Sequence, residues 1–147
     1  MENNELFTDI KIASEMGIKS IKYDLDDNRY TISVPLEPNR NDKGTFFAGS
    51  IYSVMVLNGW GAVTLFTDSL PLGGKVSVVI ATSSIDYLSP ISGDVDSIAR
   101  IVSELDISLL NAEFNKKNRL KFSVEVELFS NDVLCAKFTG LYVAKFA

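Results

Sequence analysis

The sequence predicts one α+β domain in which an antiparallel sheet curls around a single buried helix. The first observation is a run of residues, 49–68, that is apolar on nearly every side, as expected for a helix buried in its own fold. The second is the alternation of apolar and polar residues over most of the chain after residue 73, which indicates strands. A length of 147 residues is close to that of one domain, so we expect a single domain over residues 1–147.

The first part of the chain predicts a helix and a hairpin. Apolar residues from Leu6 to Met16 recur at roughly helical spacing and Gly17 follows as a cap, so we expect an amphipathic helix over residues 3–16. The turn-forming cluster Asp26-Asp27-Asn28 lies between two short apolar runs and predicts two paired strands. Two prolines then end the second strand, and an ordered loop follows.

The apolar run 49–68 is long enough to cross a membrane, because a helix of that length spans roughly 30 Å. It contains Asn58, serines and glycines, and it lacks the flanking Lys and Arg asymmetry that orients a span. We therefore expect a core helix and no membrane span. We also expect Asn58 to be a structural tie, and the small residues within 58–61 to let another element pack closely.

Four further strands are predicted, within residues 75–90, 94–104, 119–131 and 132–146. In the third of these, apolar residues from Phe122 to Leu128 alternate with charged and polar residues, which is typical of a strand with one wet face. Asn131-Asp132 predicts a hairpin to the last strand. The connection at 106–118 is expected to hold one helical turn or more.

Composition excludes several function classes. The net charge of -5 has the wrong sign for a nucleic-acid binder. The chain has no histidine, which excludes a Ser-His-Asp triad, and its scattered acids predict no metal site. The single cysteine, Cys135, cannot form an internal disulfide, and the N-terminus lacks a basic region followed by an apolar stretch. We therefore expect a cytoplasmic protein.

Three stretches of sequence are similar to one known family: VPLEPNRNDKGTFFAGSIYSVMVLNGWG, SSIDYLSPISGD and LCAKFTGLYV. The chain resembles, from about Ile18 to Tyr142, the YiiD C-terminal-domain family of the hotdog-fold thioesterase superfamily. The resemblance implies a hotdog fold, an enzyme of fatty acid metabolism, and a homodimer or dimer of dimers formed through sheet edges. It also implies acyl-thioester substrates on coenzyme A or acyl carrier protein, with no cofactor beyond the coenzyme A or phosphopantetheine of the substrate. Members of the family are labelled thioesterases, and some are described as malonyl-thioester decarboxylases.

The central run lacks the residue that hydrolysis would need. Many hotdog thioesterases place an Asp or Glu on the central helix to activate water, but residues 44–67 contain no Asp, Glu, Lys, Arg or His. Decarboxylation of a malonyl thioester needs only donors that stabilise an enolate oxygen, and neutral amides suffice. By resemblance, Asn41 aligns with the asparagine implicated in the family's decarboxylases, so we take it as the catalytic residue. The alternative is that Asn39 and Asn41 only satisfy backbone groups of a turn.

Other candidates surround the start of the long helix, where free N–H groups favour an oxyanion. Gly49 permits close approach, and Ser50 either caps the helix or touches substrate. On a later strand, Ser83, Ser84 or Asp86 either lines the pocket or is exposed. The residues that we expect to bind substrate are Asn39, Thr45, Phe47, Gly49, Ser50 and Ser84.

Three functions stay open. The first is a malonyl-thioester decarboxylase, and the second is an acyl-thioester hydrolase that uses an acid from outside the helix, such as Asp42, Asp68 or Asp86. The third is a non-catalytic binding module, favoured if Phe46 and Phe47 fill the pocket. The basic cluster at 116–121 is either a solvated loop or a surface for a nucleotide phosphate or an acidic carrier protein.

Overall fold

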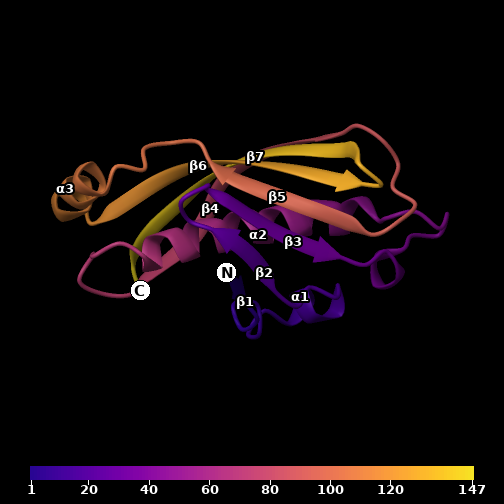
Figure 1. Cartoon of the computed structure of the whole chain (residues 1–147), viewed down its shortest axis with the longest axis horizontal. Coiled ribbons are helices and arrows are strands. Elements are labelled where there is room, and N and C mark those ends of the chain that lie inside the picture. Colours follow the sequence, from indigo (N-terminus) through magenta and orange to yellow (C-terminus); the bar gives the residue numbers. More distant parts are fainter.

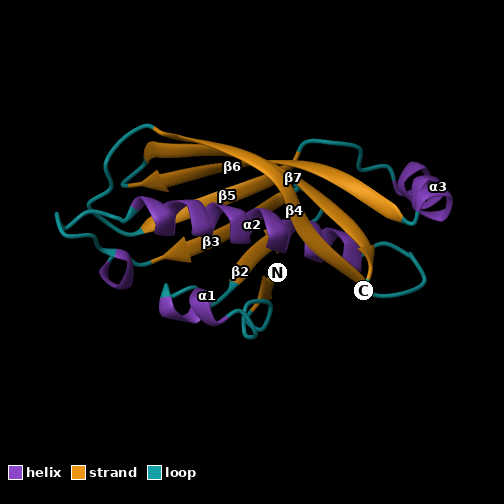
Figure 2. Ribbon diagram, turned by 180° about the vertical axis from the view of Figure 1, so that it is seen from behind, coloured by secondary structure: helices purple, strands orange, loops and turns teal.

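The computed structural model describes residues 1–147 and has a seven-stranded antiparallel sheet that curls around one long helix (Figure 1). The strand order is β1-β2-β3-β5-β6-β7-β4. The strands are β1 Glu2–Asn3, β2 Ile21–Asp24, β3 Arg29–Val34, β4 Val76–Tyr87, β5 Val95–Ile101, β6 Arg119–Ser130 and β7 Val133–Phe146. The helices are α1 Lys11–Glu15, the 3-10 turn η1 Glu37–Asn39, α2 Ala48–Asp68 and α3 Ile107–Lys117. The predicted α+β class is confirmed, and Figure 2 shows α2 lying along the concave side of the sheet.

The N-terminal helix is much shorter than predicted. A helix over 3–16 was expected, but α1 begins at Lys11, so the prediction is wrong before that residue. The Asn3 side chain accepts hydrogen bonds from the backbone N–H groups of Glu5 and Leu6, at 2.9 and 2.8 Å, and turns the chain there. Residues 2–3 instead pair with β2 as the short strand β1, which the sequence did not predict. Phe7, Ala13 and Met16 of this segment are buried in the core without belonging to one long helix, whereas Ile12 is exposed.

The predicted hairpin is confirmed as β2 and β3, and its turn is tied to a distant strand. Asn28 has a left-handed φ of 52° and exchanges two side-chain hydrogen bonds with the backbone of Ile101, at 2.7 and 3.0 Å. The loop after β3 folds back on itself through a bridge between Arg40 and Phe46. This bridge places the loop beside the start of α2.

Close contacts hold α2 against the sheet, as the small residues at 58–61 predict. Asn58 is fully buried and its amide donates to the Ser97 hydroxyl on β5 at 2.8 Å, so it is a structural tie. A Cβ added to Gly59 would lie 2.7 Å from Cζ of Tyr142, and one on Gly61 would meet side chains of β2 and the N-terminal segment. The helix is long and apolar enough to cross a membrane, and half of its most apolar stretch is buried in the fold.

The C-terminal half follows the predicted strands closely. Side chains from Phe122 to Leu128 alternate between buried and exposed along β6. Asn131 and Asp132 form the two-residue turn with φ of 49° and 63°. The connection at 106–118 forms α3, which begins at a side-chain cap by Asp106 and packs on β6.

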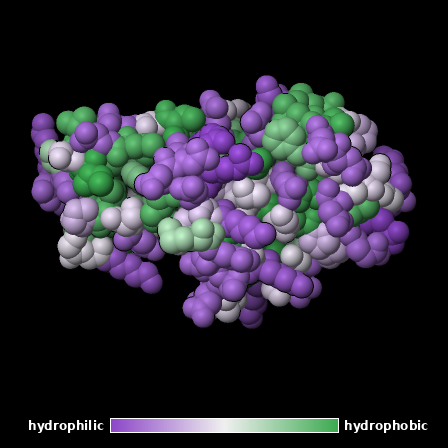
Figure 3. All heavy atoms as spheres, in the orientation of Figure 1, coloured by the Kyte–Doolittle hydropathy of each residue, from purple (hydrophilic) through white to green (hydrophobic).

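Strand β4 is an uncovered edge of the sheet, because it pairs only with β7. The register with β7 shifts between Ile80 and Thr82, so the strand bulges at Ala81. Beyond this bulge Ser83 lies opposite Gly140 and faces α2, whereas Ser84 faces outward. Figure 3 shows that hydrophilic side chains cover much of the face seen in Figure 1, with apolar patches between them.

Candidate functional site

The start of α2 offers three backbone N–H groups to a ligand. Its N-cap is Phe47, which makes no side-chain cap, and the first intrahelical bond runs from the Ile51 N–H to the Phe47 carbonyl at 3.0 Å. The N–H groups of Ala48, Gly49 and Ser50 precede that bond and lie at the positive end of the helix dipole. The expectation that Ser50 caps the helix is wrong, because the helix begins two residues earlier than Ser50.

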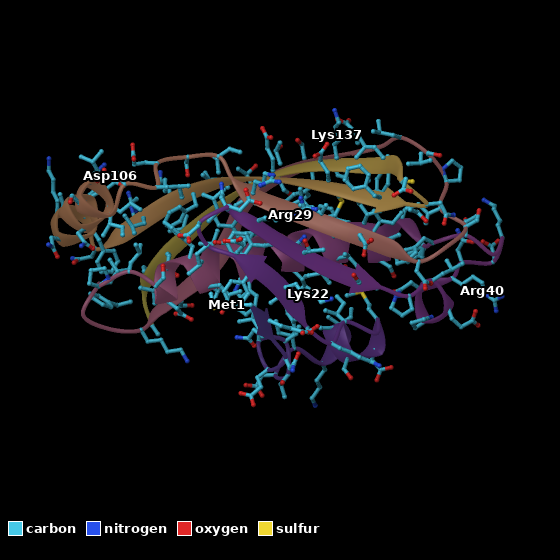
Figure 4. All side chains as sticks on the ribbon, in the orientation of Figure 1. Met1, Lys22, Arg29, Arg40, Asp106 and Lys137 are labelled. Atoms are coloured by element: carbon cyan, nitrogen blue, oxygen red, sulfur yellow. The ribbon has the colours of Figure 1, made fainter.

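Asn41 and Thr45 form one hydrogen-bonded turn just before α2. The Asn41 Oδ1 accepts from the backbone N–H groups of Lys43 and Thr45, at 2.9 and 3.0 Å, and its Nδ2 donates to the Thr45 hydroxyl at 2.9 Å. Nδ2 carries a second hydrogen that these contacts do not use. Asn41 therefore holds the turn and keeps one donor for a ligand. Figure 4 labels the neighbouring Arg40, which marks this end of the molecule.

Asn39 belongs to the support of the site. Its side chain is 2% exposed and donates to the carbonyls of Met16 and Pro35, at 2.8 and 2.9 Å. Its own carbonyl accepts from the Phe47 N–H at 2.7 Å. The structure thus places the Asn39 amide in the interior, where it anchors the loop that carries Asn41.

The two phenylalanines before α2 point to different places. Phe46 is buried in the core, whereas Phe47 is 56% exposed. The Phe47 ring lies over Gly49, where an added Cβ would come 3.0 Å from Cζ of the ring. Glycine at position 49 therefore lets Phe47 cover the helix start, and Phe46 does not fill the site.

Two tyrosines and a serine meet where the inner face of β4 packs on the start of α2: Tyr52 comes from α2, and Ser83 and Tyr87 come from β4. The hydroxyls of Tyr52 and Ser83 lie 2.5 Å apart, and the Tyr87 hydroxyl donates to the Ala48 carbonyl at 3.1 Å. Sequence reasoning considered Ser83 but chose Ser84, and it missed both tyrosines. Ser84 hydrogen-bonds Thr139 on the outer face at 3.0 Å, so the structure does not bring it to the other candidates.

The acids that a hydrolase would use lie apart from one another. Asp42 is exposed in the loop, and Asp86 projects from the outer face of β4 with Ser84. Asp68 ends α2, about 30 Å from the helix start by the rise of 1.5 Å per residue. Burial raises the pKa of Asp68, and nearby Lys75 opposes this shift. Asp68 and Asp86 thus lie away from the free N–H groups, and the Asp42 carboxylate, next to Asn41, makes no hydrogen bond with them.

An apolar cavity lies beside the middle of α2. It has a volume of about 160 Å³ and is lined by Ile10, Val56, Leu57, Trp60, Ile80 and Tyr142. The Trp60 indole is held there by a 3.1 Å hydrogen bond from its Nε1 to the Val78 carbonyl on β4. An apolar cavity of about 150 Å³ holds a molecule the size of benzene, so this one fits a short acyl chain.

Comparisons with known proteins agree with this architecture. A family model described as "Putative thioesterase (yiiD_Cterm)" matches residues 3–146. A solved structure described as a "putative thioesterase" from Shewanella oneidensis is 31% identical with a TM-score of 0.77, and the match covers 98% of this chain and 94% of that one. A protein of unknown function from Chlorobaculum tepidum is 26% identical with a TM-score of 0.85, over 98% of this chain and 92% of that one.

A thioesterase from Haemophilus influenzae shares the fold at 16% identity and a TM-score of 0.73, over 96% of this chain and 86% of that one. The neighbours from Shewanella oneidensis and Haemophilus influenzae are described as thioesterases, and the shared fold is the hotdog fold, a sheet wrapped around a central helix. Because the family model spans nearly the whole sequence, the chain belongs to the family described as "Putative thioesterase (yiiD_Cterm)", a hotdog-fold family that processes acyl thioesters.

Proposed function

We propose that the protein decarboxylates malonyl thioesters, carried by acyl carrier protein or coenzyme A, to the acetyl thioester. The observation that supports this most is the start of α2, where uncapped N–H groups lie next to the turn that holds the unused Asn41 hydrogen, and residues 44–67 contain no Asp, Glu, Lys, Arg or His. When the C–C bond breaks and carbon dioxide leaves, the electron pair moves onto the thioester carbonyl oxygen. Preorganised donors stabilise that enolate oxygen.

Hydrolysis needs a base, and the one carboxylate at this end of a single chain is the exposed Asp42, which makes no hydrogen bond with the helix start. Attack by water on the thioester carbonyl needs a base within hydrogen-bond reach. Asp42 is exposed on the loop before α2. Asp68 lies at the far end of α2, and Asp86 lies on the outer face of β4. The geometry of one chain therefore favours a reaction that needs hydrogen-bond donors and no base.

The substitution Asn41→Asp tests the role of Asn41 without removing its turn. An aspartate still accepts from the N–H groups of Lys43 and Thr45 but loses the amide donor. We expect carbon dioxide release from malonyl thioester to fall about 100- to 1000-fold. Asn118→Asp, at the end of α3, is the matched control and should keep the wild-type rate. An unchanged rate in Asn41→Asp would assign Asn41 to the turn alone.

Acyl-thioester hydrolysis is the second candidate, and two observations favour it. The family is described by that activity, and the cavity of about 160 Å³ beside Trp60 fits a short acyl chain. Release of free thiol from an acyl thioester with about six acyl carbons would support hydrolysis. Absence of both products would favour the non-catalytic binding module.

We further propose that two copies pair through their β4 edges. A strand of 12 residues with one unpaired edge needs cover, and a second copy related by a twofold axis supplies an antiparallel partner. Half-exposed apolar side chains of Val56, Leu57 and Trp60 on α2 lie near this edge and would be covered as well. In such an antiparallel pair, the start of β4 in one subunit lies beside the end of β4 in the other. The end of β4 is close to the start of α2, because the Tyr87 hydroxyl binds the Ala48 carbonyl. The start of β4 in one subunit therefore lies near the start of α2 in the other.

The basic end of the molecule fits a substrate carried by an acidic protein. Lys116 and Lys117 end α3, Arg119 and Lys121 follow on β6, and Lys145 on β7 lies opposite Arg119. This group contrasts with the net charge of -5 for the chain. In the proposed dimer it would lie on the same side as the partner's α2 start, so it would attract an acidic carrier toward that site.

A further inference from the structure

We infer that the hydroxyl pair of Tyr52 and Ser83 donates the proton that completes the reaction, an inference that rests on the proposed decarboxylation. Loss of carbon dioxide leaves an enolate whose C2 carbon has a lone pair and lacks one hydrogen. The acetyl product forms only when a proton reaches that carbon. Amide N–H groups stabilise the enolate oxygen but do not release a proton, so the site needs a further donor.

The structure offers few donors near the start of α2. Residues 44–67 hold no carboxylic acid, ammonium or imidazole, and Arg40, Asp42 and Lys43 of the preceding loop are exposed, so the donors between α2 and β4 are hydroxyls. The Tyr87 hydroxyl is committed to the Ala48 carbonyl at 3.1 Å, and the Tyr142 hydroxyl to the Val56 carbonyl at 2.7 Å. The pair of Tyr52 and Ser83 is different, because its two hydroxyls bind each other.

Two hydroxyls that share one hydrogen bond leave one hydrogen for a third partner. Either hydroxyl can donate within this pair, and we place the shared hydrogen on Ser83, which leaves the more acidic phenol hydrogen of Tyr52 for the substrate. Ser83 then donates to the tyrosine oxygen and stabilises the negative charge that forms there when Tyr52 gives up its proton. The distance of 2.5 Å between the oxygens suits such a bond.

Tyr52 lies about one turn after the start of α2, and its hydroxyl meets Ser83 on the inner face of β4. It follows Ala48 by four residues, so both lie on the same side of α2, the side that faces β4. Side chains of a helix lean toward its N-terminus, which carries the Tyr52 ring over the first turn. The ring is held in place by an edge contact with Phe138, with ring centres 5.9 Å apart.

The proposed step balances without any other reactant. The Tyr52 O–H bond breaks, its hydrogen bonds to C2 of the enolate, and the enolate electron pair forms the new C–H bond. The negative charge passes to the Tyr52 oxygen, where the Ser83 hydroxyl stabilises it until water restores the proton. The net reaction consumes one proton from solvent and releases carbon dioxide and the acetyl thioester.

The stereochemistry of protonation distinguishes this role from a purely structural one. With a methylmalonyl thioester in deuterium oxide, a fixed donor adds deuterium to one face of the enolate and gives one enantiomer of the 2-deuteriopropionyl thioester. We expect Tyr52→Phe to lose this preference, because water then protonates both faces, and to slow product formation about 100-fold. Ser83→Ala should slow the reaction less and keep the preference. Tyr23→Phe, which removes a phenol hydroxyl on β2, is the matched control.

Each outcome bears on a separate claim. A racemic product from the wild type, or a Tyr52→Phe protein with unchanged rate and stereochemistry, would overturn the assignment of the proton donor and leave decarboxylation standing. If Tyr52→Phe does not fold, a Ser83→Ala protein with an unchanged rate would overturn it instead. No carbon dioxide from the wild type would overturn decarboxylation itself, and this inference with it.

Discussion

Two buried tyrosines show how single hydroxyl groups affect the stability of this fold. Tyr30 and Tyr142 are both fully buried, but only the Tyr142 hydroxyl has a partner, the carbonyl of Val56 at 2.7 Å. A buried hydroxyl without a hydrogen bond costs stability, whereas a paired one contributes about 1 kcal/mol. We therefore expect Tyr30→Phe to leave the free energy of unfolding unchanged or raise it by about 1 kcal/mol, and Tyr142→Phe to lower it by about 1 kcal/mol.

Urea unfolding of both variants at neutral pH measures this difference, and an equal loss in both would contradict it.

Tyr30 also predicts that the free energy of unfolding depends on pH in the alkaline range. Burial raises the pKa of Tyr30 to about 12 from 10.0, so the unfolded chain loses this proton first as the pH rises. The free energy of unfolding should then fall between about pH 10 and pH 12, and fall less in Tyr30→Phe.

At the residue scale the sequence predicts the turn residues of the candidate site better than its side-chain directions. Asn41 satisfies backbone N–H groups of its turn, one of the two roles that its sequence context suggested, whereas its hydrogen bond with the Thr45 hydroxyl was not predicted. Ser84 was chosen over Ser83 because alternation alone does not reveal the bulge at Ala81, which sets the direction of every later side chain on β4.

The elements are fixed by packing between α2 and the sheet, and Gly59 tests this packing. A Cβ there would overlap the rigid ring and hydroxyl of Tyr142, whereas a Cβ on Gly61 would lie 3.1 Å from the end of the flexible Ile21 side chain. Overpacking costs about 1–3 kcal/mol, and replacing glycine by alanine in a helix returns about 1 kcal/mol. We expect Gly59→Ala to be destabilised by about 1–2 kcal/mol and Gly61→Ala to stay near the wild type.

Thermal and urea unfolding of these two variants gives the comparison, and equal stability would show that Tyr142 moves aside without cost. The continuous apolar run of α2 and the strict alternation of β6 predicted these two elements within a few residues. The N-terminal segment was not, because a side-chain turn at Asn3 and a strand pairing with β2 outweigh its helical spacing. Neither interaction leaves a periodic pattern in the sequence.

The whole molecule is proposed to be a dimer through β4, and Thr82 lies at the middle of that edge. Two copies related by a twofold axis would place equivalent central residues close together, so Thr82→Lys would set two like charges side by side. We expect the wild type to have twice the chain mass of 16.2 kDa and Thr82→Lys to have the mass of one chain. Sedimentation equilibrium measures this, and a monomeric wild type would contradict the pairing.

The charge distribution of the molecule gives a separate prediction about its substrate. Reversing Lys116 and Lys117 to glutamate should raise KM for malonyl thioester on an acidic carrier protein about tenfold, with kcat retained. The same substitutions should leave a small malonyl thioester of N-acetylcysteamine unaffected, because it presents no acidic surface. Reversal of Lys19 and Lys22, which lie by the outer face of β2, is the matched control. Equal KM values in all three proteins would remove this end of the molecule from carrier recognition.

The central claim is that this hotdog protein breaks a C–C bond of its thioester substrate and leaves the thioester intact. The most direct test is incubation of the purified wild-type protein with a carbon-13 malonyl thioester, with all products resolved by mass. The account predicts acetyl thioester and carbon dioxide in equal amounts, with no free thiol. Free thiol and malonate in place of acetyl thioester would contradict it.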